Sequence, residues 1–201
     1  GAWGSRPVPI EETMRALNDL KSQGKIRAIG VSNFSRAQIE DAARFGTIDS
    51  LQPPYSLFWR QVEKDALPAC AASGITVLAY SPMAQGILAG RFGAQPVFAK
   101  DDHRRGHRLF QPDIYPRVRE ALERLKPIAD RNCVTPGQLA LAWVIAHSGV
   151  CAIAGARNAE QAAENARAAT LALSAADRAE MDAISRTVTD ALDENPVQWK
   201  F

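Results

Sequence analysis

Apolar residues recur at intervals of three or four positions near the start of the chain. This spacing places on one stripe Ile10, Met14, Leu17 and Leu20. It predicts an amphipathic helix over residues 9–23, which Gly24 would end. A short apolar run over residues 26–31 then predicts a strand.

The same alternation of helix and strand continues to the end of the chain. It predicts further helices over residues 36–45, 61–73, 116–131, 136–147, 159–168 and 175–186, and strands over residues 48–52, 75–80 and 150–154. Ser35 with Gln38, and Thr135 with Gln138, have the spacing of capping boxes. Strands separated by helices indicate one α/β domain over residues 1–201, with a parallel sheet buried on both faces. Only residues 85–112 interrupt this alternation of helices and strands, and they are expected to form a long loop that acts as a lid.

Polar or aromatic side chains stand at the ends of three predicted strands. Ser32 and Asn33 end the first strand, Gln52 ends the second and Tyr80 ends the third. Parallel sheets bind their ligands at this end of the strands. A turn or helix cap is the simpler role for Ser32 and Asn33, a bond to loop backbone for Gln52, and core packing for Tyr80.

Two further segments have features of phosphate-binding sites. The loop over residues 81–91 is rich in small residues with accessible backbone N–H groups, and Arg91 adds positive charge. A predicted strand passes through Gly155 into a helix whose N-terminus, together with Arg157, would attract an anion. A solvated surface arginine is the alternative for Arg157.

The amino-acid sequences of three segments resemble those of the aldo-keto reductase family. These segments are PIEE at residues 9–12, GKIRAIGVSNF at residues 24–34 and AYSPMAQG at residues 79–86. The resemblance runs from Pro9 to about residue 184 and implies the C-terminal half of a (β/α)8 barrel, with about four of the eight strands. A chain that opens on Gly1 rather than Met agrees with a fragment or a processed chain, and the first half of the barrel is expected to be missing.

The resemblance implies which residues hold a nicotinamide cofactor. Ser32 and Asn33 would hold the carboxamide, Gln52 would contact the nicotinamide, and Tyr80 would stack on its ring. The residues expected along the phosphates and the adenosine are Ser81, Met83, Gln85, Arg91, Gly155, Arg157, Gln161, Glu164 and Asn165. NADP(H) is the expected cofactor. Gly155 and Ala156 stand where many members have Lys and Ser, which leaves NAD(H) open.

The family's catalytic Asp, Tyr and Lys would precede this segment, and counting back from Pro9 puts Ala2 at the place of its catalytic His. No catalytic residue is therefore assigned. His103, His107 and His147 are expected to have surface or packing roles, while Tyr55 and Trp59 line either the substrate side or the core.

The implied activity is NAD(P)H-dependent reduction of an aldehyde or ketone, with this chain supplying the cofactor half and alone being inactive or very slow. Two other classes remain open: a nucleotide-regulated binding or sensor module, and an inactive half-barrel. The half-barrel would pair with itself or with the missing N-terminal half.

Composition agrees with a globular cytoplasmic protein: 201 residues, 46% hydrophobic, with a net charge of +2. No apolar run is long enough for a membrane span, and no signal peptide opens the chain. The small net charge argues against a nucleic-acid surface, although residues 100–108 are locally basic. The three cysteines, Cys70, Cys133 and Cys151, are expected to be reduced core thiols rather than disulfides or metal ligands.

Overall fold

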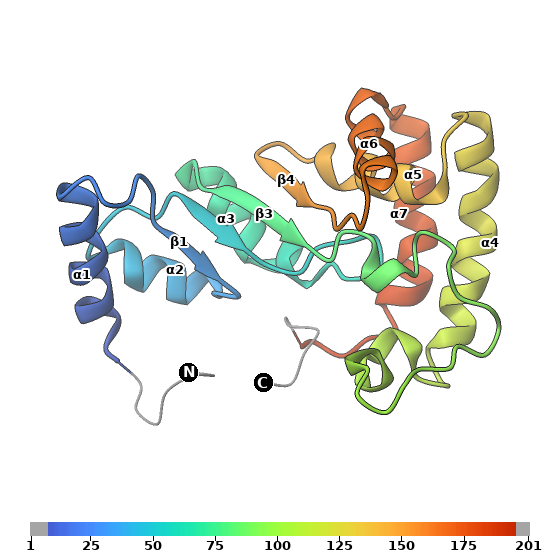
Figure 1. Cartoon of the computed structure of the whole chain (residues 1–201), viewed down its shortest axis with the longest axis horizontal. Helices are drawn as coiled ribbons and strands as arrows, with labels where there is room; N and C mark the ends of the chain where they lie inside the picture. The colour runs from blue at the N-terminus through green and yellow to red at the C-terminus, as the bar shows by residue number, and fades with distance from the viewer. Residues whose placement is uncertain (1–7, 196–201) are drawn as a thin grey trace.

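The computed structural model describes residues 8–195, and it contains a four-stranded sheet together with the helices that connect its strands (Figure 1). The strands are β1 (Gly30–Ser32), β2 (Ser50–Gln52), β3 (Thr76–Tyr80) and β4 (Val150–Ile153). They pair in the order β1-β2-β3-β4, and every pair is parallel. The predicted α/β class and the predicted number of strands are confirmed.

The helices alternate with the strands along most of the chain. They are α1 (Ile10–Ser22), α2 (Arg36–Ala43), α3 (Ala66–Ser73), α4 (Tyr115–Arg131), α5 (Pro136–Ile145), α6 (Ala159–Arg167) and α7 (Ala175–Thr189). Short 3-10 turns are η1 (Gln61–Lys64), η2 (Ala84–Gly86), η3 (His103–Gly106), η4 (Arg108–Phe110) and η5 (Ala168–Thr170). Within residues 8–195, no helix is both long and apolar enough to cross a membrane.

Local sequence signals fix several helix ends, among them the two expected capping boxes. Both capping boxes form: Ser35 opens α2 with Gln38, and Thr135 opens α5 with Gln138. Gly74 ends α3 in the left-handed conformation, with φ of 68°. The caps hold because each side chain replaces a hydrogen bond that the helix terminus lacks.

The single helix predicted over residues 61–73 is wrong. The segment splits into η1 and α3 at Asp65, where φ is −145° and ψ is −52°. Pro68 explains the break, because inside a continuous helix its ring would clash and its missing N–H would cost a bond. After the restart at Ala66, Pro68 lies in the first turn of α3, where no N–H is needed.

The first strand begins later than residue 26. Asp49 intervenes: its carboxylate accepts from the Ile29 backbone N–H at 2.7 Å, and its own N–H donates to the Ile29 carbonyl at 2.8 Å. The side chain of Asp49 thus takes a place that a strand partner would fill, and regular pairing starts at Gly30 with Ser50.

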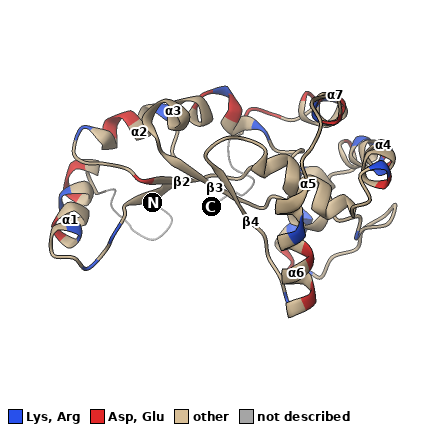
Figure 2. Ribbon diagram, turned by 90° about the horizontal axis from the view of Figure 1, so that it is seen from above, with Lys and Arg blue, Asp and Glu red and all other residues tan. Residues whose placement is uncertain are grey.

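Only one face of the sheet is buried within the described residues, so the prediction of two buried faces is wrong. Leu51, Val77 and Val150 point to the buried face, whereas Ser32, Thr76, Cys151 and Ile153 on the other face are exposed. The helices lie along one side of the strands, and no described helix covers the opposite side (Figure 2). Alternating exposure along each strand follows directly from this one-sided cover.

The cysteine prediction is correct for Cys70, which is buried, and wrong for Cys133 and Cys151, which are exposed. Cys133 follows the end of α4 with φ of 54°, at a turn that faces solvent. Cys151 lies on the uncovered face of β4. All three thiols are free.

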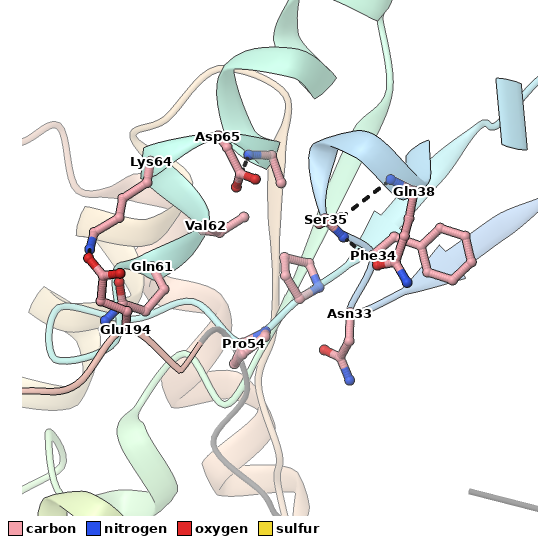
Figure 3. A pocket seen from close by; sticks show the side chains of 12 residues that line it. Asn33, Phe34, Ser35, Gln38, Pro54, Gln61, Val62, Lys64, Asp65 and Glu194 are labelled. Carbon is pink, nitrogen blue, oxygen red and sulfur yellow. Dashed lines mark hydrogen bonds and ion pairs between the residues drawn. The ribbon is translucent and has the colours of Figure 1, made fainter. Parts of the chain in front are cut away.

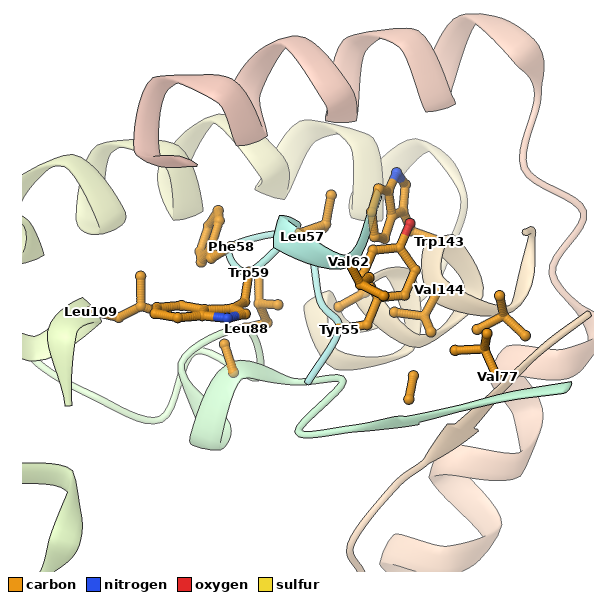
Figure 4. Close-up of a cluster of buried hydrophobic side chains, with 14 of the residues drawn as sticks. Tyr55, Leu57, Phe58, Trp59, Val62, Val77, Leu88, Leu109, Trp143 and Val144 are labelled. Atoms are coloured by element: carbon orange, nitrogen blue, oxygen red, sulfur yellow. The ribbon is translucent and has the colours of Figure 1, made fainter. Parts of the chain in front are cut away.

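Tyr55 and Trp59 belong to the core rather than to an open substrate surface. Their exposed fractions are 0% and 1%. Together with Trp143, Leu57 and Phe58 they belong to one buried cluster, in which Tyr55 lies beside Trp143 and Trp59 lies beside Leu88 and Leu109 (Figure 4). This cluster packs the segment that follows β2 against the helices.

Helices α4 and α7 are joined at their ends by a charged cluster. Arg131 donates from Nε to Asp177 Oδ1 at 2.7 Å, and Asn132 donates to Oδ2 of the same carboxylate at 3.2 Å. Ser174, the N-cap of α7, accepts from the Asp177 backbone N–H at 3.0 Å. The hydrogen bonds from Arg131, more than any other contact, hold the pKa of Asp177 below its usual range.

Asp177→Asn is expected to destabilise the fold at neutral pH and to lose that effect in acid. Because the folded-state pKa is lowered, the carboxylate stabilises the fold fully above the unfolded value of about 4 and less as the pH falls through the folded value. Melting temperatures of wild type and variant at pH 7 and near pH 2 measure the difference. Asp41→Asn, on the exposed side of α2, is the control; a gap in melting temperature that stays constant with pH contradicts the linkage.

Candidate functional site

Four of the expected site residues form one bonded group at the C-terminal ends of neighbouring strands. The Ser32 hydroxyl donates to the Gln52 carbonyl at 2.9 Å, and the Asn33 backbone N–H donates to the same oxygen at 3.1 Å. The Tyr80 hydroxyl donates to Asn33 Oδ1 at 3.1 Å. Ser32 and Gln52 are paired in register, which brings the ends of β1 and β2 together.

These bonds fix side chains while leaving some of their capacity for a ligand. The Ser32 oxygen keeps lone pairs that can accept, and an asparagine amide keeps its two N–H donors when its oxygen accepts. Asn33 adopts φ of 58°, a left-handed conformation that asparagine tolerates better than most residues. A group that both donates and accepts, such as a carboxamide, matches this set.

A groove of about 410 Å³ lies beside this group, between the loop after β3 and the start of α6. Its lining consists of Ser81, Pro82, Met83, Gln85, Gly86, Ala89, Arg91, Phe92, Arg104, Ile153, Gly155, Ala156, Arg157 and Gln161. The loop of residues 81–91 and the turn of residues 155–161, which are far apart in the sequence, therefore meet in one groove. The two phosphate-binding candidates of the sequence are brought together.

The loop after β3 turns sharply through unusual backbone conformations. Ser81, Ala84 and Gln85 have φ of 52°, 48° and 59°, all left-handed. The Gln85 amide donates to the Ser81 hydroxyl at 2.8 Å and holds the turn closed. Left-handed residues other than glycine are costly and gather at functional sites, which agrees with a binding loop here.

The turn before α6 is fixed by side-chain bonds. Asn158 caps the helix by accepting from the Gln161 backbone N–H at 2.8 Å. The Gln161 side chain accepts from the Arg157 backbone N–H at 2.9 Å. The exposed Arg157 side chain stands beside the groove, where the positive end of the helix adds to its charge.

Glu164 and Asn165 do not line this groove. Asn165 donates to the Gly155 carbonyl at 3.1 Å, and Glu164 accepts from the Thr135 hydroxyl at 3.3 Å. The Gln138 amide also donates to the Glu164 carbonyl at 3.0 Å. In the described structure both residues support the turn and join α6 to α5.

Arg104 lines the groove and was missed by sequence reasoning. It lies in the long loop, where its guanidinium stacks over Phe92 and Phe98 at 5.6 and 4.9 Å from the ring centroids. Asp102 accepts from Arg104 Nε at 2.9 and 3.0 Å, and these bonds hold the pKa of Asp102 down to about 2. The Asp-x-Arg spacing inside the basic stretch was the available signal.

A second pocket, of about 370 Å³, opens on the other side of Asn33 (Figure 3). Its apolar wall includes Phe34, Pro54 and Val62, and an ion pair of 3.2 Å between Lys64 and Glu194 stands at its edge (Figure 3). This places the last described turn of the chain near the ends of β1 and β2.

The three histidines occupy one surface position and two packed positions. His103 is exposed, His107 is 1% exposed, and His147 packs against Trp143 with ring centroids 4.7 Å apart. Ala2, the position counted for a catalytic histidine, lies outside the described residues.

Comparisons with known proteins agree with this geometry. The model of the Aldo/keto reductase family matches residues 2–186. The NADH-specific methylglyoxal reductase of Escherichia coli is 37% identical over 195 residues, which are 95% of this chain and 58% of that protein. An aldo-keto reductase of Bacillus subtilis is 35% identical over 161 residues, 79% of this chain and 49% of its own length.

Among solved structures, the glycerol dehydrogenase of Gluconobacter oxydans superimposes with a TM-score of 0.87 and 32% identity. The match covers 95% of this chain and 59% of that one. The chain thus spans about half the length of the curated relatives that it matches. Its four consecutive parallel strands correspond to part of the barrel of these enzymes. The chain belongs to the aldo/keto reductase family.

Proposed function

We propose that this chain binds NADP(H), with NAD(H) as the alternative, and supplies the cofactor-binding half of an enzyme that reduces aldehydes or ketones. The observation that carries the proposal is the continuous set of ligand-compatible groups along one edge of the sheet. It runs from Ser32 through Tyr80 to the groove that ends at Arg157. Relatives named as NADH-specific and as NADP(+) enzymes support a nicotinamide cofactor of either kind.

The residues present fit such a dinucleotide. A carboxamide would find an acceptor at Ser32 and amide donors at Asn33 and Gln52. Phosphates would meet Arg91, Arg104 and Arg157, three guanidinium groups that line one groove. The adenosine would lie toward Gln161, with Glu164 and Asn165 shaping the turn behind it.

When bound, the reduced nicotinamide supplies a hydride to the carbonyl carbon of the substrate. In this proposal, the protein orients the ring through its carboxamide, and the Tyr80 ring covers one face so that the substrate meets the other. Met83 and the rest of loop 81–91 exclude water along the phosphates. The proton for the product alcohol comes from the half of the barrel that this chain does not match, so the chain alone completes the reduction very slowly or not at all.

Calorimetric titration of NADPH and of NADH into the chain tests the binding. Saturable binding of at least one dinucleotide, weakened by Tyr80→Ala, supports the proposal. A chain that is folded by circular dichroism yet binds neither dinucleotide contradicts it. Carbonyl reductase activity that appears only when the remaining barrel half is added supports the division of labour.

Residues 85–112 are expected to act as a lid. The loop carries Arg91 and Arg104 on its groove side, while Val97 is 93% exposed and the segment around it is mostly exposed. Phosphates that bridge Arg91 and Arg104 would tie this segment to the groove, so its amide hydrogen exchange should slow when NADPH is added. Unchanged exchange in a chain shown to bind NADPH contradicts the lid.

The uncovered sheet face supports a second role, association with a partner half-barrel or with another copy. Thr76, Cys151 and Ile153 are exposed on this face, and Ile153 at 43% is one of the large apolar side chains that remain in solvent. Covering them would bury apolar surface and shield the open strand edges. Sedimentation with and without a separately expressed N-terminal half distinguishes the two occupants.

The free thiols Cys133 and Cys151 favour a reducing setting, and we place the protein in the cytoplasm.

A further inference from the structure

The chain between β2 and the core cluster has an unusual backbone. Pro53 and Pro54 follow Gln52 directly, and proline has no N–H to donate. The pairing of β2 with β3 nevertheless continues past Gln52. The Tyr80 N–H donates to the Pro53 carbonyl at 3.0 Å, and the Tyr55 N–H donates to the Tyr80 carbonyl at 3.2 Å. Of residues 53–55, Tyr55 alone can make that second bond.

The side chain of Tyr55 is held as firmly as its backbone. It is fully buried, its ring centroid lies 5.4 Å from that of Trp143, and its hydroxyl donates to Glu63 Oε1 at 2.7 Å. Burial, and next the charge of Glu63, raise the pKa of this phenol, so it stays a neutral donor. The hydroxyl oxygen also lies 3.1 Å from His147 Nε2.

The acceptor of that bond is itself fixed by charged neighbours. Arg60 bonds both oxygens of Glu63 at 2.9 Å and donates to Asp182 Oδ1 at 2.8 Å. Its guanidinium also lies 4.8 Å from the Trp143 ring centroid. The position of the Glu63 carboxylate is therefore fixed by Arg60, and the hydrogen bond to Glu63 fixes the position of the Tyr55 hydroxyl.

We propose that Tyr55 is a positioning residue for the nicotinamide end of the cofactor site, an inference that rests on the proposed function. The phenol is anchored at the Glu63 and His147 side, and this sets the position of the Tyr55 backbone. The Tyr55 N–H in turn holds the Tyr80 carbonyl. Tyr80 passes the constraint on to Asn33 through its own hydroxyl bond of 3.1 Å. Tyr55 acts entirely through Tyr80 and touches no ligand.

Tyr55→Phe removes only the hydroxyl and keeps the buried ring. Its effect is measured on the binding affinity for NADPH and, in parallel, on the affinity for 2′-phospho-ADP-ribose, which lacks the nicotinamide. We expect about 3- to 10-fold weaker binding of NADPH, the size of one lost hydrogen bond, with binding of 2′-phospho-ADP-ribose unchanged. Hydrogen exchange of the Tyr55 and Tyr80 amides in the free chain should become faster, which reports the same loosening without any ligand.

Tyr115→Phe is the matched control. Tyr115 is also buried, and its hydroxyl donates to the Gly93 carbonyl at 2.7 Å, in the loop that would face the phosphates common to both ligands. It should leave the ratio of the two affinities and the exchange of the Tyr80 amide as in wild type. Equal weakening of both ligands by Tyr55→Phe, or an unchanged Tyr80 amide, overturns the inference while the proposed function stands. A wild-type chain that binds neither ligand overturns the proposed function, and the inference with it.

Discussion

Trp143→Ala should lower the free energy of unfolding by about 3–5 kcal/mol, the usual cost of removing a large aromatic side chain from a core. Trp143 is fully buried, donates from Nε1 to Asp182 at 3.1 Å, and packs against both Tyr55 and His147. Because whole domains are stable by only about 5–15 kcal/mol, the variant will be close to unfolding. Urea denaturation followed by far-ultraviolet circular dichroism measures the loss.

Trp143→Phe separates packing from hydrogen bonding. It keeps an aromatic ring against Tyr55 and gives up the bond to Asp182, so its cost should be clearly smaller than that of alanine. If alanine costs less than about 1 kcal/mol, the core of Figure 4 does not hold the segment after β2 as described.

Arg157→Ala should weaken the binding of NADPH by about 10-fold or more and the binding of NADH by much less. The reason is that only NADPH carries a 2′-phosphate, and a charge-assisted hydrogen bond contributes about 1.5–3 kcal/mol. Arg157 stands at the N-terminus of α6 beside the groove, where the helix favours an anion as well. Titration of both cofactors into wild type and variant at low and high salt gives the two ratios.

Arg167→Ala is the control for Arg157, because this exposed arginine lies in the last turn of the same helix. It removes the same charge from the opposite end of α6 and should leave both affinities unchanged. Equal losses of NADPH and NADH on Arg157→Ala would mean that Arg157 does not recognise the 2′-phosphate.

Local signals in the sequence predicted what depends on local structure. Ser35 and Thr135 open their helices because a capping side chain needs only the next turn as its partner. Pro68 carried the information that divides residues 61–73, yet apolar spacing alone suggested one helix. The sequence around Ser32 and Tyr80 predicted where the strands end. The hydrogen bond that joins Tyr80 to Asn33 is seen only in the structure.

Features that depend on distant parts of the chain could not be predicted in this way. The exposure of Cys151 follows from which face of the sheet the helices cover, and no residue near Cys151 encodes that. Arg104 reaches the groove because Phe92 and Phe98 fold the long loop around it. Tyr55 is buried by Trp143, which lies far along the chain.

Left-handed residues other than glycine in the loop after β3 lower the stability of the folded state. Ala84 is buried at φ of 48°, and Gln85 follows at 59°, each at a cost of about 1 kcal/mol or more to the folded state. Glycine would relieve this cost at both positions. Laboratory evolution for thermal tolerance should therefore enrich glycine at Ala84 and Gln85, and the resulting looser turn would hold a ligand less firmly. Under the proposed function, stabilising this loop with glycine would therefore weaken cofactor binding.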